Sequence, residues 1–311
     1  MLFSALLFIA GLLLLYYGAE YLVSGSSRLA LSFGIRPLVV GMTVVAFATS
    51  MPELLVSLFA SVRGSSDIAA GNIIESNIAN IGLILGAAAM LRPLEVGQST
   101  LRRELPAMLF GSVLFYGLCI DHVVGRIDGV IQLGLLIAFI IYCIRTARDG
   151  SELKCNEVVA AYTTRNRDIV LVIVGIIGLA IGAELMVRSA VSIARGFGVS
   201  ELVIGVTIVA IGTSLPELAA SMVSAWKGEM ELSIGNVIGS NIFNLQFVLG
   251  LSPIIKPLPV APGVLFFELP VMLIFAFGLF AMLFFGRRLG RSHGVALLGC
   301  YSVLMLAMVF R

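Results

Sequence analysis

The feature that most constrains this chain is a succession of apolar stretches, each about long enough to cross a lipid bilayer. A helix needs roughly 20 apolar residues to span the hydrocarbon core. Hydrophobic residues make up 59% of the chain and charged residues only 12%, about half the charged fraction of an ordinary soluble domain. The sequence therefore predicts an all-α integral membrane protein. We expect ten transmembrane helices, at 2–23, 36–62, 67–91, 104–120, 127–146, 168–187, 200–226, 231–255, 263–286 and 293–310.

The Lys and Arg residues are distributed unevenly between alternate loops. Ten spans put both termini on one face of the membrane, and more than twice as many basic residues fall on the opposite face. Because Lys and Arg concentrate in cytoplasmic loops, we expect both termini to lie outside and the stretch at 147–167 to be a cytoplasmic loop. The chain has no basic run, so nothing indicates a nucleic-acid partner.

The second half of the chain repeats the first at a constant offset of 164 residues. GMTVVAFATSMPELLVS at 41–57 aligns with GVTIVAIGTSLPELAAS at 205–221, and GNIIESNIANIGLILG at 71–86 aligns with GNVIGSNIFNLQFVLG at 235–250. We therefore expect two five-helix repeats, with their motifs at 41–86 and 205–250. The repeats should cover 1–146 and 168–311.

An odd number of spans in each repeat makes the two repeats enter the membrane in opposite directions. Inverted-topology repeats are typical of secondary transporters, whose ions bind near the midplane where interrupted helices of both halves meet. The duplication thus favours transport by alternating access.

Each motif places polar side chains on one face of an otherwise apolar helix. Residues three or four apart share a helix face, and this spacing joins Ala46, Thr49, Ser50 and Glu53. It joins Ala210, Thr213, Ser214 and Glu217 in the second repeat. The spans that follow carry further polar stripes, formed by Asn72, Ser76 and Asn80, and by Asn236, Ser240 and Asn244.

The ligand atoms in these stripes are carboxylate, hydroxyl and amide oxygens, which suit hard cations such as Ca²⁺ and not zinc or copper. Pro52 and Pro216 lack the N–H that would bond the preceding turn. We therefore expect backbone carbonyls near Ala46 and Ala210 to be freed, which membrane proteins tolerate where the carbonyls line a cavity.

Glu53 and Glu217 determine the charge balance of the expected site. Two carboxylates close together at membrane depth repel each other unless a cation or protons neutralise them. Two negative charges match one Ca²⁺, two monovalent cations or two protons. The residues alone therefore leave the coupling ion open.

The paired motifs TSMPE…GNIIESNIAN and TSLPE…GNVIGSNIFN resemble the α-repeats of the calcium/cation antiporter superfamily, which includes the sodium/calcium exchangers. The chain is most similar to the bacterial and archaeal branch, especially to Gram-negative inner-membrane members with RRELP after the third span. The resemblance implies a ten-helix fold with four core helices around the cation sites, across which the first and sixth helices slide. The ligands that it implies are Ala46 and Ala210 by their carbonyls, with Thr49, Ser50, Glu53, Ser76, Asn80, Thr213, Ser214, Glu217, Ser240 and Asn244.

Two residues depart from the family pattern. Several exchangers have an aspartate where this chain has Asn244, so the expected site holds two carboxylates instead of three and leaves protons open as the coupling ion. Glu75 stands where the second repeat has Gly239. We expect Glu75 to be structural or to face the lipid interface, with an accessory proton site as the alternative.

These observations predict a secondary antiporter of a bacterial inner membrane that exchanges Ca²⁺ for Na⁺. A Ca²⁺/H⁺ or K⁺-dependent exchanger is the alternative. We expect no cofactor and no obligate protein partner beside Ca²⁺, Na⁺ and membrane lipid. A cation channel could use the same ligands, but the inverted duplication favours alternating access. An intramembrane enzyme is disfavoured because no histidine or cysteine lies near the motifs.

Overall fold

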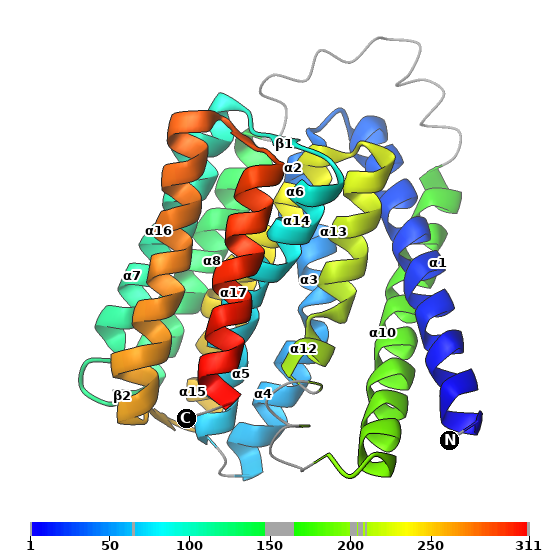
Figure 1. Ribbon diagram of the computed structural model, residues 1–311. Helices are drawn as coiled ribbons and strands as arrows, with labels where there is room; N and C mark the ends of the chain where they lie inside the picture. Colours follow the sequence, from blue (N-terminus) through cyan, green and yellow to red (C-terminus); the bar gives the residue numbers. More distant parts are fainter. Residues whose placement is uncertain are drawn as a thin grey trace.

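The structure, a computed structural model, describes residues 2–63, 66–146, 165–199, 204, 208 and 210–309. This part of the chain forms a bundle of helices joined by short connections (Figure 1). The α-helices are α1 (Leu2–Phe33), α2 (Pro37–Val40), α3 (Ala46–Thr49), α4 (Met51–Arg63), α5 (Ser66–Ala79), α6 (Gly86–Leu91), α7 (Leu105–Leu118), α8 (Arg126–Thr146), α10 (Arg165–Gly196), α12 (Ala210–Thr213), α13 (Leu215–Lys227), α14 (Met230–Phe243), α15 (Leu249–Ile255), α16 (Leu269–Gly286) and α17 (Arg291–Val309). The π-helical segments are η1 (Gly41–Val45), η2 (Asn80–Leu85), η3 (Thr100–Glu104), η5 (Asn244–Val248) and η6 (Val264–Glu268).

Seven of the described helices are long and apolar enough to cross a membrane, or eight if the bent pair Pro37–Thr49 and Met51–Ser61 is one span. The expected spans at 104–120 and 200–226 are not among them. α7 has only 14 residues and follows η3, which carries two arginines and a glutamate. Part of 200–226 lies outside the described residues. A total of ten crossing helices therefore stays a prediction.

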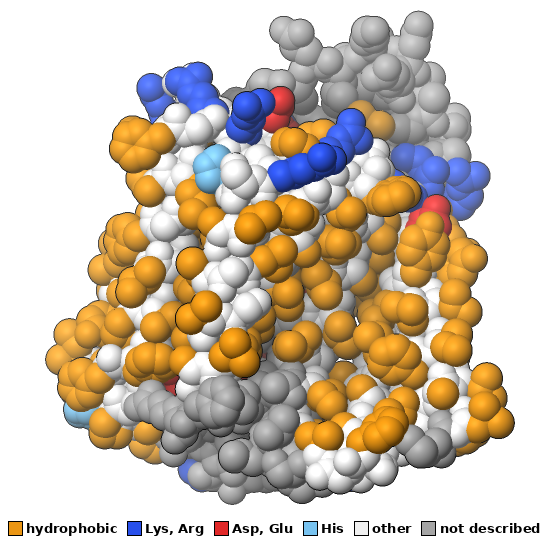
Figure 2. All heavy atoms as spheres, in the orientation of Figure 1, with side chains coloured by type: hydrophobic (Ala, Val, Ile, Leu, Met, Phe, Trp, Pro, Cys, Tyr) orange, Lys and Arg blue, Asp and Glu red, His pale blue; other side chains and the backbone are white. Residues whose placement is uncertain are grey.

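Apolar side chains cover the flanks of the molecule, whereas Lys and Arg gather at one end (Figure 2). Leu6, Ile137 and Ile177, on three different helices, are each more than half exposed. Exposing so many apolar side chains is unfavourable in water and favourable against lipid. α1 begins and α17 ends at the end of the bundle opposite the basic side chains (Figure 1).

The first and sixth spans are longer than predicted. We expected 2–23 and 168–187, but α1 and α10 each have 32 residues. Hydropathy placed the boundaries where polar residues begin. For α1 the structure shows a reason, because Arg28, which lies beyond the predicted end, has its Nε 2.8 Å from the buried Asp168 Oδ1.

α1 and α10 lie side by side and run antiparallel (Figure 1). Glycine makes the contact close, since a Cβ added to Gly18 would lie 2.7 Å from the backbone N of Leu179. A Cβ added to Gly25 would lie 2.8 Å from the carbonyl oxygen of Asp168. Small residues at such positions let membrane helices approach each other. We call this line of close contacts between α1 and α10 the glycine seam.

The two motifs form the centre of the bundle. α14 packs against α2, η1 and α3 from the other half of the chain, and α5 packs against α4 and α12. All residues of α14 from Leu232 to Phe243 are buried. This packing brings helices of both repeats to one place in the interior.

Four short strands depart from the all-α prediction. β1 (Leu94–Glu95) pairs antiparallel with β4 (Arg288–Leu289), and β2 (Val123–Val124) pairs antiparallel with β3 (Leu258–Pro259). The two ladders lie at opposite ends of the bundle and join a loop of the first half to a loop of the second (Figure 1). Strands of two residues are too short to show the alternation by which strands are predicted.

Candidate cation site

Both motifs interrupt a helix at the same position of the repeat. Ser50 lies between α3 and α4 with φ −79° and ψ 4°. Ser214 lies between α12 and α13 with φ −86° and ψ 7°. The helical segments on either side of Ser50 are bent by 44°. Pro52 and Pro216 explain the break, because a proline offers no N–H to the turn before it and crowds the carbonyl four residues back.

Glu53 and Glu217 lie in the first turns of α4 and α13, where the helix dipole favours negative charge. Both side chains are completely buried. Ser50 Oγ donates to Glu217 Oε1 at 3.4 Å, and Ser214 Oγ donates to Glu53 Oε1 at 3.5 Å. The serine of each repeat thus contacts the glutamate of the other. The two carboxylates are close enough for their charges to repel each other.

Further hydroxyl groups complete this contact between the repeats. Thr213 lies near the Glu53 carboxylate, and Thr49 lies near that of Glu217. The hydroxyl oxygens of Thr49 and Ser240 lie 3.4 Å apart. Ser214 Oγ also lies 3.3 Å from Ser76 Oγ. The hydroxyl residues predicted for the site therefore lie in one buried cluster.

Asn80 and Asn244 begin the π-helical turns η2 and η5. Asn80 Nδ2 donates to Asn241 Oδ1 at 3.0 Å, and Asn244 Nδ2 donates to Asn77 Oδ1 at 3.1 Å. Asn77 and Asn241 are missing from the predicted ligand set. Their signal was present in the sequence, because they occupy equivalent positions of the repeat.

Four buried oxygens of this cluster have no hydrogen-bond partner within the described part of the chain. They are Glu53 Oε2, Glu217 Oε2, Asn80 Oδ1 and Asn244 Oδ1, which are two equivalent pairs. Leaving a buried polar atom unpaired costs about 1–3 kcal/mol, and more for a charged group. Coordination of a cation would remove this cost, and ligands that are all oxygen suit a hard cation.

The site relies on hydroxyl and amide oxygens as well as carboxylates. Among the described residues, no group of three or more His, Cys, Asp or Glu side chains is placed to hold a metal ion. The two glutamates supply the charge, and neutral oxygens would complete the coordination shell. This composition agrees with the oxygen ligands predicted from the motifs.

The backbone near Ala46 differs from the expectation. Its carbonyl accepts the Ser50 amide at 3.0 Å and the Thr49 hydroxyl at 3.4 Å, so it is not freed by Pro52. The irregularity lies one turn earlier, in the π-helical segment η1, a type of turn that often occurs at functional sites. In the second repeat, the Ser214 amide bonds the Ile211 carbonyl at 3.1 Å, whereas the predicted contacts of Ala210 lie outside what the structure describes.

Glu75 lies next to Ser76 in the chain but outside this cluster. It is half-buried, and its carboxylate is near enough to that of Glu268 of η6 for the two charges to repel each other. Within the described residues, no hydrogen bond joins it to Glu53 or Glu217. The structural interpretation of Glu75 and the accessory proton site both stay open.

Comparison with known proteins identifies relatives over the whole length of the chain. The family model described as sodium/calcium exchanger protein matches residues 3–145 and again residues 168–310. The inner membrane protein YrbG of Escherichia coli is 40% identical over 319 residues, covering 100% of this chain and 98% of the relative. The sodium/calcium exchanger MaX1 of Methanosarcina acetivorans is 32% identical over 343 residues, covering 98% of each protein.

The fold is also shared with a solved structure. The sodium–calcium exchanger NCX_Mj, in crystals soaked with Na⁺ and Sr²⁺, superposes with a TM-score of 0.85 at 34% sequence identity. The match covers 97% of both chains.

Proposed function

Because the chain belongs to the sodium/calcium exchanger family, we propose that it is an antiporter that exchanges Ca²⁺ for Na⁺ at one site shared by its two repeats. The family consists of secondary transporters and not of enzymes, and the chain is an integral membrane protein. The observation that carries the proposal is the set of four unpaired buried oxygens, two from each repeat.

One Ca²⁺ would neutralise Glu53 and Glu217 together, and two Na⁺ would do the same. Because both kinds of cation need the same carboxylates, they compete, and the entry of Na⁺ weakens the binding of Ca²⁺. The other ligands of the proposed site are Thr49, Ser50, Ser76, Asn80, Ala210, Thr213, Ser214, Ser240 and Asn244, without Ala46, whose carbonyl already accepts two hydrogen bonds.

The proposed topology is ten spans in two inverted repeats, at 1–146 and 168–311, joined by the loop at 147–167. The antiparallel run of the equivalent helices α1 and α10 supports it, as does the double match of the family model. The basic end of the bundle would face the cytoplasm and both termini the outside. The similarity to YrbG supports a bacterial inner membrane as the location.

Alternating access would come from movement of the α1–α10 pair against the core. Three cavities, of about 340, 230 and 230 Å³, lie along this interface. The largest reaches Pro52, Thr213 and Pro216 beside the proposed site. Loose packing on one side and a close glycine seam within the pair are what a sliding unit requires.

Ca²⁺ uptake by vesicles that contain the pure protein tests this function. With the voltage clamped by an ionophore, an outward Na⁺ gradient should drive Ca²⁺ uptake, and an equal K⁺ gradient should not. Uptake driven only by a pH gradient would refute Na⁺ coupling and establish the Ca²⁺/H⁺ alternative, which the amide at Asn244 leaves open. Uptake driven by a Ca²⁺ gradient alone would indicate a channel.

A further inference from the structure

Two cavities share Arg103 of η3, away from the cation site. The first has a volume of about 460 Å³ and is lined by Arg36, Ser99, Arg102, Arg103 and Glu231. We call it the arginine pocket. The arginines come from two segments far apart in the chain, so the fold gathers them at one place.

The second cavity, of about 400 Å³, lies between α7 and α8 and is mainly apolar. We call it the α7–α8 groove. Its apolar lining is formed by Ala107, Phe110, Leu135, Ala138 and Phe139. The eight residues from Leu135 to Tyr142 correspond to about 10 Å along a helix, at a rise of 1.5 Å per residue. A basic pocket therefore continues into an apolar groove along two helices.

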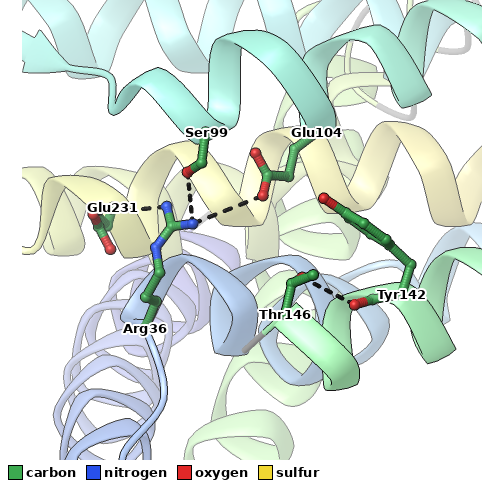
Figure 3. A network of polar contacts seen from close by, with 6 residues as sticks. All are labelled: Arg36, Ser99, Glu104, Tyr142, Thr146 and Glu231. Carbon is green, nitrogen blue, oxygen red and sulfur yellow. Dashed lines mark hydrogen bonds and ion pairs between the residues drawn. The ribbon is translucent and has the colours of Figure 1, made fainter. Parts of the chain in front are cut away.

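The charge of Arg36 is already balanced within the arginine pocket. Arg36 Nη1 donates to Ser99 Oγ at 2.7 Å and lies 3.8 Å from Glu104 Oε1, while Nη2 lies 3.9 Å from Glu231 Oε1 (Figure 3). Arg36 is largely buried, and Arg102 and Arg103 are exposed. Three arginines (Arg36, Arg102 and Arg103) stand against the two glutamates here, which leaves a net formal charge of +1, and the exposed pair lies at the mouth of the pocket.

The boundary between pocket and groove carries polar atoms that lack partners. Tyr142 lines the groove together with Arg103, near the end of α8 (Figure 3). Its buried hydroxyl and the Oε1 of the buried Gln246 have no hydrogen-bond partner within the described residues. A hydroxyl donor that lines a cavity together with Arg103 suits a phosphate or ester oxygen.

The other repeat carries aromatic side chains at the positions of the two arginines. η3 and η6 are equivalent π-helical turns, and Phe266 and Phe267 take the places of Arg102 and Arg103. Phe266 is 69% exposed, so the difference lies on the surface. In the proposed topology, η3 lies at the cytoplasmic leaflet, which is rich in anionic lipid, and η6 lies at the other leaflet.

We propose that the arginine pocket and the α7–α8 groove together bind one anionic phospholipid. Arg102 and Arg103 hold the headgroup phosphate, and one acyl chain lies in the groove. The Tyr142 hydroxyl donates to a phosphate or ester oxygen at the boundary. This site contains none of the proposed cation ligands, so its existence does not depend on which ions the protein exchanges.

Native mass spectrometry of the full chain tests the proposal directly. The protein is released from detergent with phosphatidylglycerol or phosphatidylethanolamine at equal concentration. We expect one phosphatidylglycerol per chain to be retained, at least about tenfold over phosphatidylethanolamine. Equal retention of the two lipids would overturn the proposal, and so would displacement of the bound lipid by inorganic phosphate alone.

Two kinds of variant distinguish lipid binding at this site from a general effect of positive charge on lipid retention. Arg102→Gln with Arg103→Gln should abolish retention, whereas Arg288→Gln with Arg291→Gln removes the same charge at the same end and should not. Ala138→Trp fills the groove without changing charge and should also abolish retention, unlike Val113→Trp on the exposed side of α7. Equal loss in both arginine pairs, or full retention in Ala138→Trp, would refute the proposed site.

Discussion

At the centre of the molecule the two repeats match, and at its rim they differ. Ser50 reaches Glu217 at 3.4 Å and Ser214 reaches Glu53 at 3.5 Å, whereas the surface pair Arg102–Arg103 corresponds to Phe266–Phe267. In the proposed mechanism one site binds the same cations from both sides of the membrane, and the inverted repeats can supply it with equivalent ligands. In the proposed topology the rim faces two leaflets of different lipid composition, so it has no reason to be symmetric.

The equivalent helices α1 and α10 also differ in the contacts that they make near their ends. On α1, Glu20 and Ser24 bind Lys227 Nζ at 3.1 and 2.7 Å, and Ser27 Oγ donates to Glu229 Oε1 at 2.8 Å. The equivalent glutamate of α10, Glu184, pairs with Arg188 of its own helix. α1 is therefore tied to the turn between α13 and α14 by contacts that differ from those of its counterpart.

The largest expected effect comes from removing either glutamate. Glu53→Gln and Glu217→Gln should each abolish Ca²⁺ uptake by vesicles, because each removes one of two buried carboxylates. Truncating one member of a buried charge pair costs about 2–5 kcal/mol, so we expect Ca²⁺ to bind at least about 30-fold more weakly. Glu95→Gln, at the exposed position of strand β1, is the control. Uptake at the wild-type rate in either variant contradicts the shared site.

The two serines test whether the repeats contribute equally. Ser50→Ala and Ser214→Ala each remove one hydrogen bond to a glutamate, worth about 1.5–3 kcal/mol for a charged acceptor. Both should raise the Ca²⁺ concentration for half-maximal uptake by roughly 10- to 100-fold, to a similar extent. Ser112→Ala, which loses only a bond to the Met108 carbonyl, should have little effect. A large effect from one serine and none from the other would refute the symmetry of the site.

Asn244→Asp changes the charge of one repeat alone. A third carboxylate should bind Ca²⁺ about tenfold more tightly, because affinity rises with the number of charged ligands. It should also add one Na⁺ to each exchange cycle, since a further negative charge needs a further monovalent cation. The measurement is the effect of membrane potential on net Ca²⁺ flux, because exchange of one Ca²⁺ for two Na⁺ moves no net charge whereas exchange for three Na⁺ does. Flux that stays independent of voltage in the variant would contradict the charge balance.

The smallest effect is expected where α1 meets the core. Lys227→Met removes an exposed ion pair, worth about 0–1 kcal/mol, and the contact with Ser24. If these contacts hold α1 in one position, the maximal exchange rate should rise about two- to fivefold. Arg188→Met breaks the pair within α10 and should leave the rate unchanged. Equal changes in both variants would mean that the contacts of α1 have no special role.

The centre of the molecule could be predicted from the sequence because the repeat displays it twice. The two TSxPE segments predict both helix breaks and both buried glutamates. In the structure, the predicted hydroxyl residues lie together in one cluster. The state of the Ala46 carbonyl was harder to predict. A proline predicts that a backbone hydrogen bond is lost, but not which neighbouring turn becomes π-helical.

Features that depend on contacts between distant segments left no local signal in the sequence. The continuation of α1 past its predicted end comes with the Arg28–Asp168 pair, whose members stand far apart in the chain. The strands β1–β4 are too short to show a period. The repeat shows that Asn77 and Asn241 occupy equivalent positions, but nothing in the spacing indicates that Asn77 accepts a hydrogen bond from Asn244.

The number of Ca²⁺ ions bound per chain tests the central claim most directly. Equilibrium dialysis with radioactive Ca²⁺ should find one ion per chain in the wild-type protein, displaced by Na⁺. Neither Glu53→Gln nor Glu217→Gln should bind Ca²⁺ at concentrations that saturate the wild type. Two ions per chain in the wild type, with one lost in each variant, would show that each repeat has its own site and would contradict the account.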